Sequence, residues 1–443
     1  MKVIHHGGHE GVTGSCHQVL LDDRRSLLVD CGLFQGDDAR GRDEEQIDFP
    51  LDGIQGLILT HVHIDHIGRV PYLMGAGFRG PIYCTPPTAK LLPLMLEDAM
   101  RIGVTRNKKL IERFLHELRR HVRPLAYGKW HKLDGGVQIR FSPAGHILGS
   151  AYVEVDYKNE RYVFSGDLGS TNSPLLIDPV SPQRADLLVL ESTYGDRLHE
   201  GRDVRSQQLE QILCRTLQNK GVTIIPAFSL GRTQELLYEL NEIFRRVEEE
   251  QGCSLLKRVN VVVDSPLALR LTQIYDSMRE YWDNEAKHVL TYDDQPLVFN
   301  NLVHISEHDE HRDMVEYLRD SKMPAIVIAA SGMCTAGRVV NYLKAFISES
   351  TTDVVFIGFQ SHGTPGRYIQ DGKDWVRLDG QRFDIRATAH TLSGYSAHAD
   401  QADLIRFVTQ MDERPKAIRL VHGEQQARTV LAEKLRELGY QVD

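Results

Sequence analysis

The segment GLILTHVHIDH, residues 56–66, is the most informative stretch of this chain. Its first half is a short apolar run that predicts a buried strand, and its second half places three histidines and one aspartate directly after that strand. Residues i and i+2 of an extended segment point the same way, so His61 and His63 can converge on one ion. Asp65 and His66 follow the turn and can address a second ion. Because imidazole and carboxylate are the usual zinc ligands of hydrolytic sites, we expect a two-metal centre rather than a chance polar loop.

Other apolar runs in the first half of the chain end in the same kind of turn. They are SLLVDCG (26–32), RYVFSGDLG (161–169) and DLLVLESTYGD (186–196). Loops at the ends of buried strands are held by a rigid sheet and often carry functional groups. His146, Asp167 and His422 occupy such loops and are further candidate ligands, although a lone histidine is more often structural. Asp30 has the same setting and could orient a ligand or a water.

From about residue 203 the chain alternates between strands and helices. Its strand-like runs are VTIIPAF (222–228), VNVVVD (259–264), AIVIAA (325–330) and DVVFIGF (353–359). This alternation predicts a parallel sheet with helices on both faces. Ligands of such domains usually bind beyond the carboxyl ends of the strands. The turns there, which include 229–232, 264–266, 331–333 and 360–363, are small and polar. They suit a phosphate and suit ordinary strand–helix turns equally well.

Composition narrows the class of protein. The chain has 443 residues, enough for two or three domains, and its 41% apolar content is normal for a globular protein. The N-terminus shows no apolar signal segment, and no apolar stretch approaches the roughly 20 residues that span a bilayer. Six cysteines lie far apart without a C-x-x-C pair. We therefore expect a protein of the reducing cytoplasm with no membrane partner.

The net charge of −9 does not by itself favour a nucleic-acid partner, but a local groove can differ from the average. Residues 101–123 hold eight basic side chains against Glu112 and Glu117. The basic residues are Arg101, Arg106, Lys108, Lys109, Arg113, Arg119, Arg120 and Arg123. A solvated helix face and a surface that follows phosphates explain this run equally well.

These motifs resemble those of the metallo-β-lactamase superfamily, and within it the β-CASP nucleases, over nearly the full length of the chain. The chain is similar to the bacterial and archaeal RNA-cutting members and to the nuclease subunit of the eukaryotic pre-mRNA cleavage machinery. The four superfamily motifs match Asp30, the run 61–66, His146 and Asp167. The three β-CASP motifs match Glu191, His398 and His422.

The resemblance implies an α/β protein: a metallo-β-lactamase αββα sandwich with an inserted β-CASP domain, whose parallel sheet is Rossmann-like. We expect the metallo-β-lactamase domain at 1–195, the β-CASP domain at 196–384 and the C-terminal part of the first domain at 385–443. The resemblance also implies two Zn²⁺ ions per chain. One is held by His61, His63 and His146, the other by Asp65, His66 and His422, and Asp167 bridges them.

The same resemblance indicates a substrate and a mechanism. DNA-processing members typically carry valine at the last motif, so His422 favours RNA. A metal-bridging hydroxide would attack phosphorus in line, because zinc lowers the pKa of bound water toward about 7. His398 would protonate the leaving 3′-oxygen and Glu191 would hold its ring, which predicts 5′-phosphate and 3′-hydroxyl ends. Asp65 and Asp30 are counted with them as catalytic residues. Candidate substrate-binding residues are Arg232, Ser331, Gly332, Met333 and Ser393.

Two other classes of function remain open at this point. A hydrolase of the same fold could act on a thioester, a lactam or a small phosphodiester, and some family members are non-catalytic RNA-binding subunits. The large insertion argues against the first and the intact ligand set against the second. Whether cutting is internal or proceeds from a 5′ end is open, and a homodimer would fit the family without any clear mark in the sequence.

Overall fold

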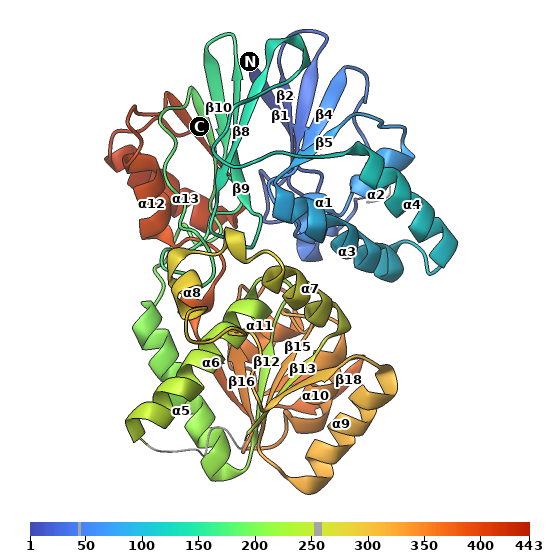
Figure 1. Cartoon of the computed structure of the whole chain (residues 1–443), viewed down its shortest axis with the longest axis vertical. Coiled ribbons are helices and arrows are strands. Elements are labelled where there is room, and N and C mark those ends of the chain that lie inside the picture. Colours follow the sequence, from blue (N-terminus) through green and yellow to red (C-terminus); the bar gives the residue numbers. More distant parts are fainter. Residues whose placement is uncertain (43–45, 252–258) are drawn as a thin grey trace. The chain divides into compact units, whose positions relative to one another are not determined.

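The computed structural model describes residues 1–42, 46–251 and 259–443. The chain divides into two compact units: Met1–Leu198 together with His398–Asp443, and His199–Ala397. In Figure 1 the first unit is drawn from blue through teal to green with a red C-terminal part, and the second runs from green to orange. The second unit is therefore an insertion into the first. The sequence prediction set the limits of this insertion at 196 and 384.

The first unit is built from two six-stranded sheets. One has the order β1 (Lys2–Gly7), β2 (Cys16–Leu20), β3 (Ser26–Val29), β4 (Ile54–Ile58), β5 (Ile82–Cys84) and β6 (Val122–Pro124). The other has the order β20 (Ala417–Val421), β11 (Leu187–Glu191), β10 (Glu160–Phe164), β9 (Ala151–Tyr157), β8 (Gln138–Pro143) and β7 (His131–Lys132). Strands β3 to β6 run parallel to one another, and so do β10, β11 and β20.

The two sheets pack face to face because alternate side chains of each strand point to the same side. Leu27 and Val29 of β3 join a buried cluster with Val153 and Val155 of β9. On the far face of the second sheet, α12 (Gln401–Thr409) and α13 (Gln425–Glu437) pack against β11 and β20 through a separate cluster. The first sheet is flanked by α1 (Ile64–Ile67), α2 (Val70–Gly75), α3 (Pro86–Gly103) and α4 (Lys108–His121) (Figure 1). This is the predicted αββα sandwich.

The second unit holds one parallel sheet, which confirms the predicted alternation. Its order is β14 (Leu302–Ile305), β13 (Asn260–Asp264), β15 (Ala325–Ala329), β12 (Val222–Pro226), β16 (Asp353–Phe356) and β19 (Thr388–Thr391). Val261 and Val263 of β13 join the core on one face, and Val262 joins the core on the other. Helices α5 (Arg202–Asn219) and α6 (Arg232–Gln251) cover the first face. Helices α9 (His308–Ser321) and α10 (Arg338–Phe346) cover the second.

Smaller elements complete this unit (Figure 1). They are α7 (Pro266–Asp276), α8 (Asn284–Val289), α11 (Pro365–Gln370) and the antiparallel hairpin of β17 (Trp375–Leu378) and β18 (Gln381–Asp384). In the part of the chain that the structure describes, no helix has both the length and the apolar character needed to cross a membrane.

A buried carboxylate ties the end of β13 to two helices of the second unit. Asp264 accepts hydrogen bonds of 2.6 Å from His311 Nδ1, Tyr342 Oη and Arg338. Burial raises the pKa of Asp264, but these three donors outweigh it and lower the pKa below its ordinary value. The polar run 304–313 alone favours a solvated helix start, but the side chain of His311 within it is buried against Asp264.

Replacing Asp264 with alanine removes the acceptor of the buried His311 and Tyr342 side chains and the ion-pair partner of Arg338. We expect the free energy of unfolding of this unit to fall by about 3 kcal/mol. Urea denaturation would be followed by tryptophan fluorescence in a Trp130→Phe background, so that Trp282 and Trp375 report on the second unit. The control is Asp276→Ala, which removes an exposed i,i+3 pair with Arg279 and should cost less than about 1 kcal/mol. Equal midpoints for Asp264→Ala and the control would contradict the role given to Asp264.

Candidate metal centre

The sequence-predicted ligands sit on four loops of the first unit, each of which follows a strand. His61 and His63 come after β4, and Asp65 and His66 lie in the single turn of α1 that begins at Ile64. His146 lies between β8 and β9, Asp167 follows β10 and His422 follows β20. The parallel register of β11 with β20 pairs Glu191 with Val421. His422 is thereby placed beside the loop that begins at Ser192.

The structure brings these side chains together in two groups. Ligand atoms of His61, His63, His146 and Asp167 lie within 4.8 Å of one another, and so do those of Asp65, His66 and His422. Asp167 stands between the groups. Its Oδ2 is 3.4 Å from His61 Nε2 and 3.5 Å from His146 Nε2. Its Oδ1 is 3.1 Å from His66 Nε2 and 3.5 Å from His422 Nε2.

The nitrogen and oxygen atoms of these side chains are arranged for binding a metal ion rather than for hydrogen bonds with one another. His61 Nε2, His66 Nε2 and Asp167 Oδ1 are buried and make no hydrogen bond of acceptable geometry to any described residue. Buried polar atoms nearly always have a hydrogen-bond partner. Imidazole nitrogens and a carboxylate oxygen that converge without one suit a divalent cation.

Three of the rings, those of His61, His66 and His422, are oriented by a group on the far side of the imidazole. Asp30 accepts a hydrogen bond of 2.8 Å from His66 Nδ1, and its other bonds come from Thr60 N and Thr60 Oγ1. Thr60 Oγ1 also lies 3.1 Å from His61 Nδ1. Thr193 Oγ1 lies 3.0 Å from His422 Nδ1. These contacts aim the Nε2 atoms at the centre, as outer partners of metal-binding histidines generally do.

The two threonines were not predicted from the sequence. Their signal was position: Thr60 directly precedes the first histidine of the H-x-H run, and Thr193 follows Glu191 by two residues. A threonine next to a candidate ligand is too common to stand out without the fold.

Close backbone packing explains two glycines in these motifs. A Cβ on Gly32 would lie 1.6 Å from the carbonyl oxygen of Asp65, and one on Gly169 would lie 1.8 Å from that of Gly145. Any side chain there would push the ligand loops apart. The glycines of the D-C-G and G-D-L-G motifs therefore allow the loops to approach.

Burial and neighbouring charges shift the pKa values of the histidines in this centre in different directions. Burial lowers the pKa of His63 to about 3 and holds the pKa of His146 well below its usual range, so both rings are neutral. Burial also lowers the pKa of His422, but the charge of Asp167 and a hydrogen bond with Asp65 outweigh it and raise the pKa to about 9. A cation that binds beside His422 must displace its proton.

Glu191 and His398 lie at the rim of the cluster. His398 Nδ1 is 3.2 Å from each carboxylate oxygen of Glu191 and 4.0 Å from Asp167 Oδ2. Glu191 is fully buried and also accepts hydrogen bonds from the backbone N–H groups of Leu168 and Thr193. The carboxylate is thus fixed, and it fixes the ring of His398, whose side chain keeps 16% of its surface exposed.

The candidate substrate-binding residues lie in the second unit. Arg232 is buried, and its guanidinium bonds to Glu235 and to the carbonyl oxygen of Tyr395 at 2.6 Å. Ser393 donates to the carboxylate of Glu200. Both side chains are therefore engaged in contacts within their unit.

The turn after β15 is arranged differently. Ser331 and Met333 are half-buried, and Gly332 between them is buried. The carbonyl oxygen of Gly332 accepts a hydrogen bond of 2.8 Å from Gln360.

A sandwich of two sheets with histidines and aspartates converging at one end defines a metal-dependent hydrolase of the metallo-β-lactamase class. Comparison with known families agrees. The metallo-beta-lactamase superfamily model matches residues 11–225, the Beta-Casp domain model residues 233–369, and the Zn-dependent metallo-hydrolase RNA specificity domain model residues 382–443. The chain belongs to the β-CASP family of metal-dependent nucleases within that superfamily, as its motifs indicated.

Individual relatives cover nearly the whole chain. Ribonuclease TTHA0252 of Thermus thermophilus is 35% identical over 447 residues, which span 100% of this chain and 97% of that protein. Transcription termination factor FttA of Methanosarcina mazei is 29% identical over 98% of this chain and 68% of its own length. FttA of a Lokiarchaeum species is 30% identical over 97% of this chain and 68% of its own length.

Asp30 offers a test of the centre that leaves every proposed ligand in place. We expect Asp30→Ala to weaken metal affinity by about 10- to 100-fold, because His66 loses the partner that orients it. Metal content per chain would be measured by mass spectrometry after dialysis against graded chelator concentrations. His61→Ala serves as the variant that removes a ligand and His116→Ala, on the exposed face of α4, as the neutral control. An Asp30→Ala protein that retains metal as the control does would contradict the assignment.

Proposed function

We propose that this chain hydrolyses RNA phosphodiester bonds with two zinc ions and leaves 5′-phosphate and 3′-hydroxyl ends. The observation that carries the proposal is the position of Asp167, whose two oxygens face two different histidine groups at 3.1–3.5 Å. A carboxylate shared in this way suits a pair of ions rather than one. Zinc bound at such a centre supplies a nucleophile at neutral pH and stabilises negative charge on phosphoryl oxygens.

The ligand assignment follows the two groups. His61, His63 and His146 would hold one ion, Asp65, His66 and His422 the other, and Asp167 both. Thr60 and Asp30 orient the imidazoles of His61 and His66 toward the centre. The assignment rests on the convergence of these atoms and on the family to which the chain belongs.

His398 is the group that we assign to the leaving oxygen. Its Nδ1 is held by Glu191, so the ring presents a defined edge to the rim of the centre. The protonated ring can give its Nε2 proton to the 3′-oxygen as the bond to phosphorus breaks. Glu191 is then a positioning residue that acts through His398.

RNA as the substrate is supported by the comparisons. The RNA specificity domain model covers residues 382–443, which include His398 and His422, and the most completely covered relative described above is a ribonuclease. A hydrolase of small substrates and a non-catalytic subunit, the two alternatives suggested by the sequence, have no observation that favours them.

We place this activity in the cytoplasm and allow for a homodimer. The five described cysteines, Cys16, Cys31, Cys84, Cys214 and Cys334, are all free thiols. Free, mostly buried thiols suit a reducing compartment. The homodimer is proposed only because it would fit the family, and sedimentation of the purified chain tests it.

Replacement of His398 separates proton transfer from metal binding. We expect His398→Ala to lower the single-turnover rate of RNA cleavage by about 100-fold or more, with metal content unchanged. Glu191→Gln should lower the rate less, because the ring keeps a hydrogen-bond partner but loses the charge. His288→Ala, at an exposed position of α8, is the matched control. Wild-type rates in His398→Ala would remove it from the proposed mechanism, and loss of metal would make it a ligand instead.

The ends of the products test the chemistry of the cut. Attack by a water-derived nucleophile should leave a 5′-phosphate on the downstream fragment and a 3′-hydroxyl upstream, with no 2′,3′-cyclic phosphate. RNAs labelled at either end, with 5′-hydroxyl, monophosphate and triphosphate forms compared, would show which bonds are cut. We expect internal fragments from all three forms and cleavage of a circular RNA. Mononucleotides released only from the monophosphate form would instead indicate a 5′–3′ exonuclease.

A further inference from the structure

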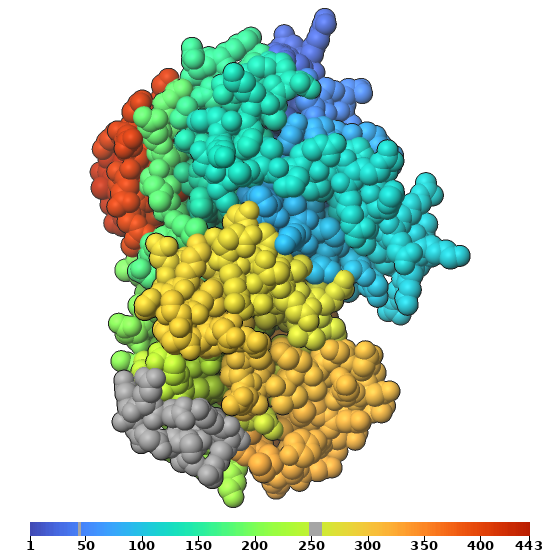
Figure 2. Space-filling model, in the orientation of Figure 1, coloured from blue at the N-terminus to red at the C-terminus, as the bar shows by residue number. Residues whose placement is uncertain are grey.

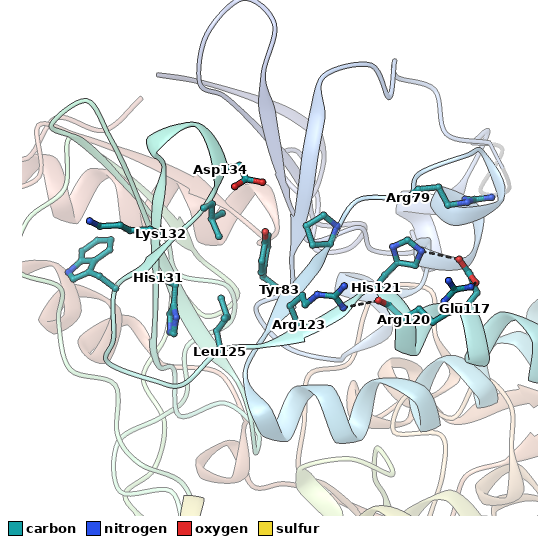
Figure 3. Close-up of a pocket in the computed structure, with 13 residues that line it drawn as sticks. Arg79, Tyr83, Glu117, Arg120, His121, Arg123, Leu125, His131, Lys132 and Asp134 are labelled. Carbon is teal, nitrogen blue, oxygen red and sulfur yellow. Dashed lines mark hydrogen bonds and ion pairs between the residues drawn. The ribbon is translucent and has the colours of Figure 1, made fainter.

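The first unit contains a pocket of about 810 Å³ that is separate from the candidate metal centre (Figure 3). It spans from β6, the last strand of one sheet, to β7, the last strand of the other. Arg123 lies in β6 and Lys132 in β7, and both line the pocket. The volume lies within the range of sites that bind drug-sized ligands or nucleotides.

Part of the pocket lies at the opposite end of the first sheet from the candidate metal centre. Strands β4, β5 and β6 are parallel, and the metal loop follows the carboxyl end of β4. Arg79 and Pro81 precede β5, and His121 precedes β6, so these pocket residues are at the amino ends. The length of β4 alone, at about 3.3 Å per residue, separates the two ends by roughly 17 Å.

Positive charge dominates the pocket. Arg79, Arg120, Arg123 and Lys132 line it, against the carboxylates of Glu117 and Asp134. Glu117 pairs with Arg120 at 3.4 Å, but Arg120 is 69% exposed, so water screens this pair. Within the described ranges, Arg79, Arg123 and Lys132 have no ion pair. The guanidinium groups of Arg79 and Arg123 donate to backbone carbonyl oxygens rather than to carboxylates.

Helix α4 continues this charge beyond the pocket. The helix buries Ile111, Leu115 and Leu118 and ends at His121, on the pocket wall. Its other face exposes basic side chains, namely Lys108, Lys109, Arg113, Arg119 and Arg120. In Figure 2 the surface of residues 100–123, in teal, lies at the margin of its unit. The basic run that the sequence left between two interpretations is therefore an exposed track that leads into a cavity.

Two aromatic rings also line the pocket. Tyr83 is half-buried on β5, and the ring of Trp130 has the guanidinium groups of Arg140 and Arg161 each 4.7 Å from its centroid. Those arginines are themselves held by Glu154 and Asp156, so the ring is fixed. Cations with fixed aromatic side chains are the elements by which proteins hold single-stranded nucleic acid without reading its sequence.

We propose that this pocket and the exposed face of α4 form an accessory binding site for single-stranded RNA. This proposal rests on the proposed ribonuclease function, because the bound strand would be the part of the substrate RNA that lies away from the cleaved bond. The cavity alone would accommodate a mononucleotide. The continuous basic track favours a strand, because successive phosphates would each meet a cation.

Charge reversal at both sides of the pocket tests the site by direct binding. Arg123→Glu/Lys132→Glu would be compared with the intact chain for binding of a fluorescent RNA of about 30 nucleotides, by anisotropy at several salt concentrations. We expect Kd to rise about 10-fold or more. The slope of log affinity against log salt should fall by about 1.4, because each phosphate contact in a single strand contributes about 0.7. Circular dichroism would verify that the variant is folded.

A matched control carries the same change of net charge elsewhere in the unit. Lys434→Glu/Arg436→Glu alters exposed residues of α13, which packs on β20, at the opposite edge of the second sheet from β7. We expect this control to bind RNA as the wild type does. An equal loss of affinity in the control would overturn the proposal, because the effect would then come from net charge alone. Loss of mononucleotide binding with unchanged RNA affinity would overturn it as well.

Cleavage of long and short RNA distinguishes this site from the catalytic centre. For the RNA of about 30 nucleotides we expect the pocket variant to raise KM about 10-fold with little change in kcat. An RNA of about five nucleotides, stacked at about 3.4 Å per nucleotide, is hardly longer than the distance between the two sites. For this short RNA we expect KM and kcat of the pocket variant to equal those of the wild type. Wild-type KM for the long RNA would overturn the accessory site. If the wild type cleaves neither RNA, the proposed function fails, while the anisotropy measurement still decides whether the pocket binds a strand.

Discussion

The carboxylate of Asp167 is the constraint on which the rest of the first unit depends. Four imidazoles lie within 3.5 Å of its two oxygens, in a site where nearly every polar atom is buried. Such a concentration of polar groups is costly to bury, and it persists only where strands hold the loops and a cation can satisfy the donors. Two buried sheets with apolar cores on both sides of the second sheet provide that rigidity. The two sheets position the ligand loops, and the convergence of these loops on Asp167 explains why so many polar side chains are buried there.

The position of β20, the last strand, helps to bring the candidate metal centre and the proposed proton donor together. β20 lies beside β11 although the whole second unit separates them in the chain. Its register brings His422 next to Thr193, and His398 stands against Glu191 at the end of β11. The C-terminal segment therefore supplies two groups to a site whose other members come from the first 193 residues. An insertion of this kind is tolerated because both ends of the second unit join the first at neighbouring loops of one sheet, as the bridge between Tyr194 and Asp400 indicates.

Local sequence patterns were sufficient for the regular parts of the structure. Runs rich in Val, Ile and Leu bounded by turns correctly predicted the parallel sheet of the second unit, since its strands are buried on both faces and carry no polar alternation. They were insufficient where a side chain meets a distant partner. His311 belongs to a polar helix start that the sequence alone predicts to be solvated, yet its side chain is buried because Asp264, at the end of β13, accepts a hydrogen bond from it. Arg232 looks available to a phosphate in sequence, yet Glu235 and Tyr395 engage it.

The H-x-H-x-D-H run needed no tertiary information to indicate a metal site, because ligands that are close in the chain are necessarily close in space. Asp30, His146, Asp167 and His422 were candidates only by their position after strands, and the resemblance to a family was needed to join them with Glu191 and His398. Their convergence is a property of strand order and register, which no local pattern encodes. The pocket between β6 and β7 depended wholly on the tertiary structure. Its walls come from two sheets, and only their packing turns a run of basic residues in α4 into one side of a cavity.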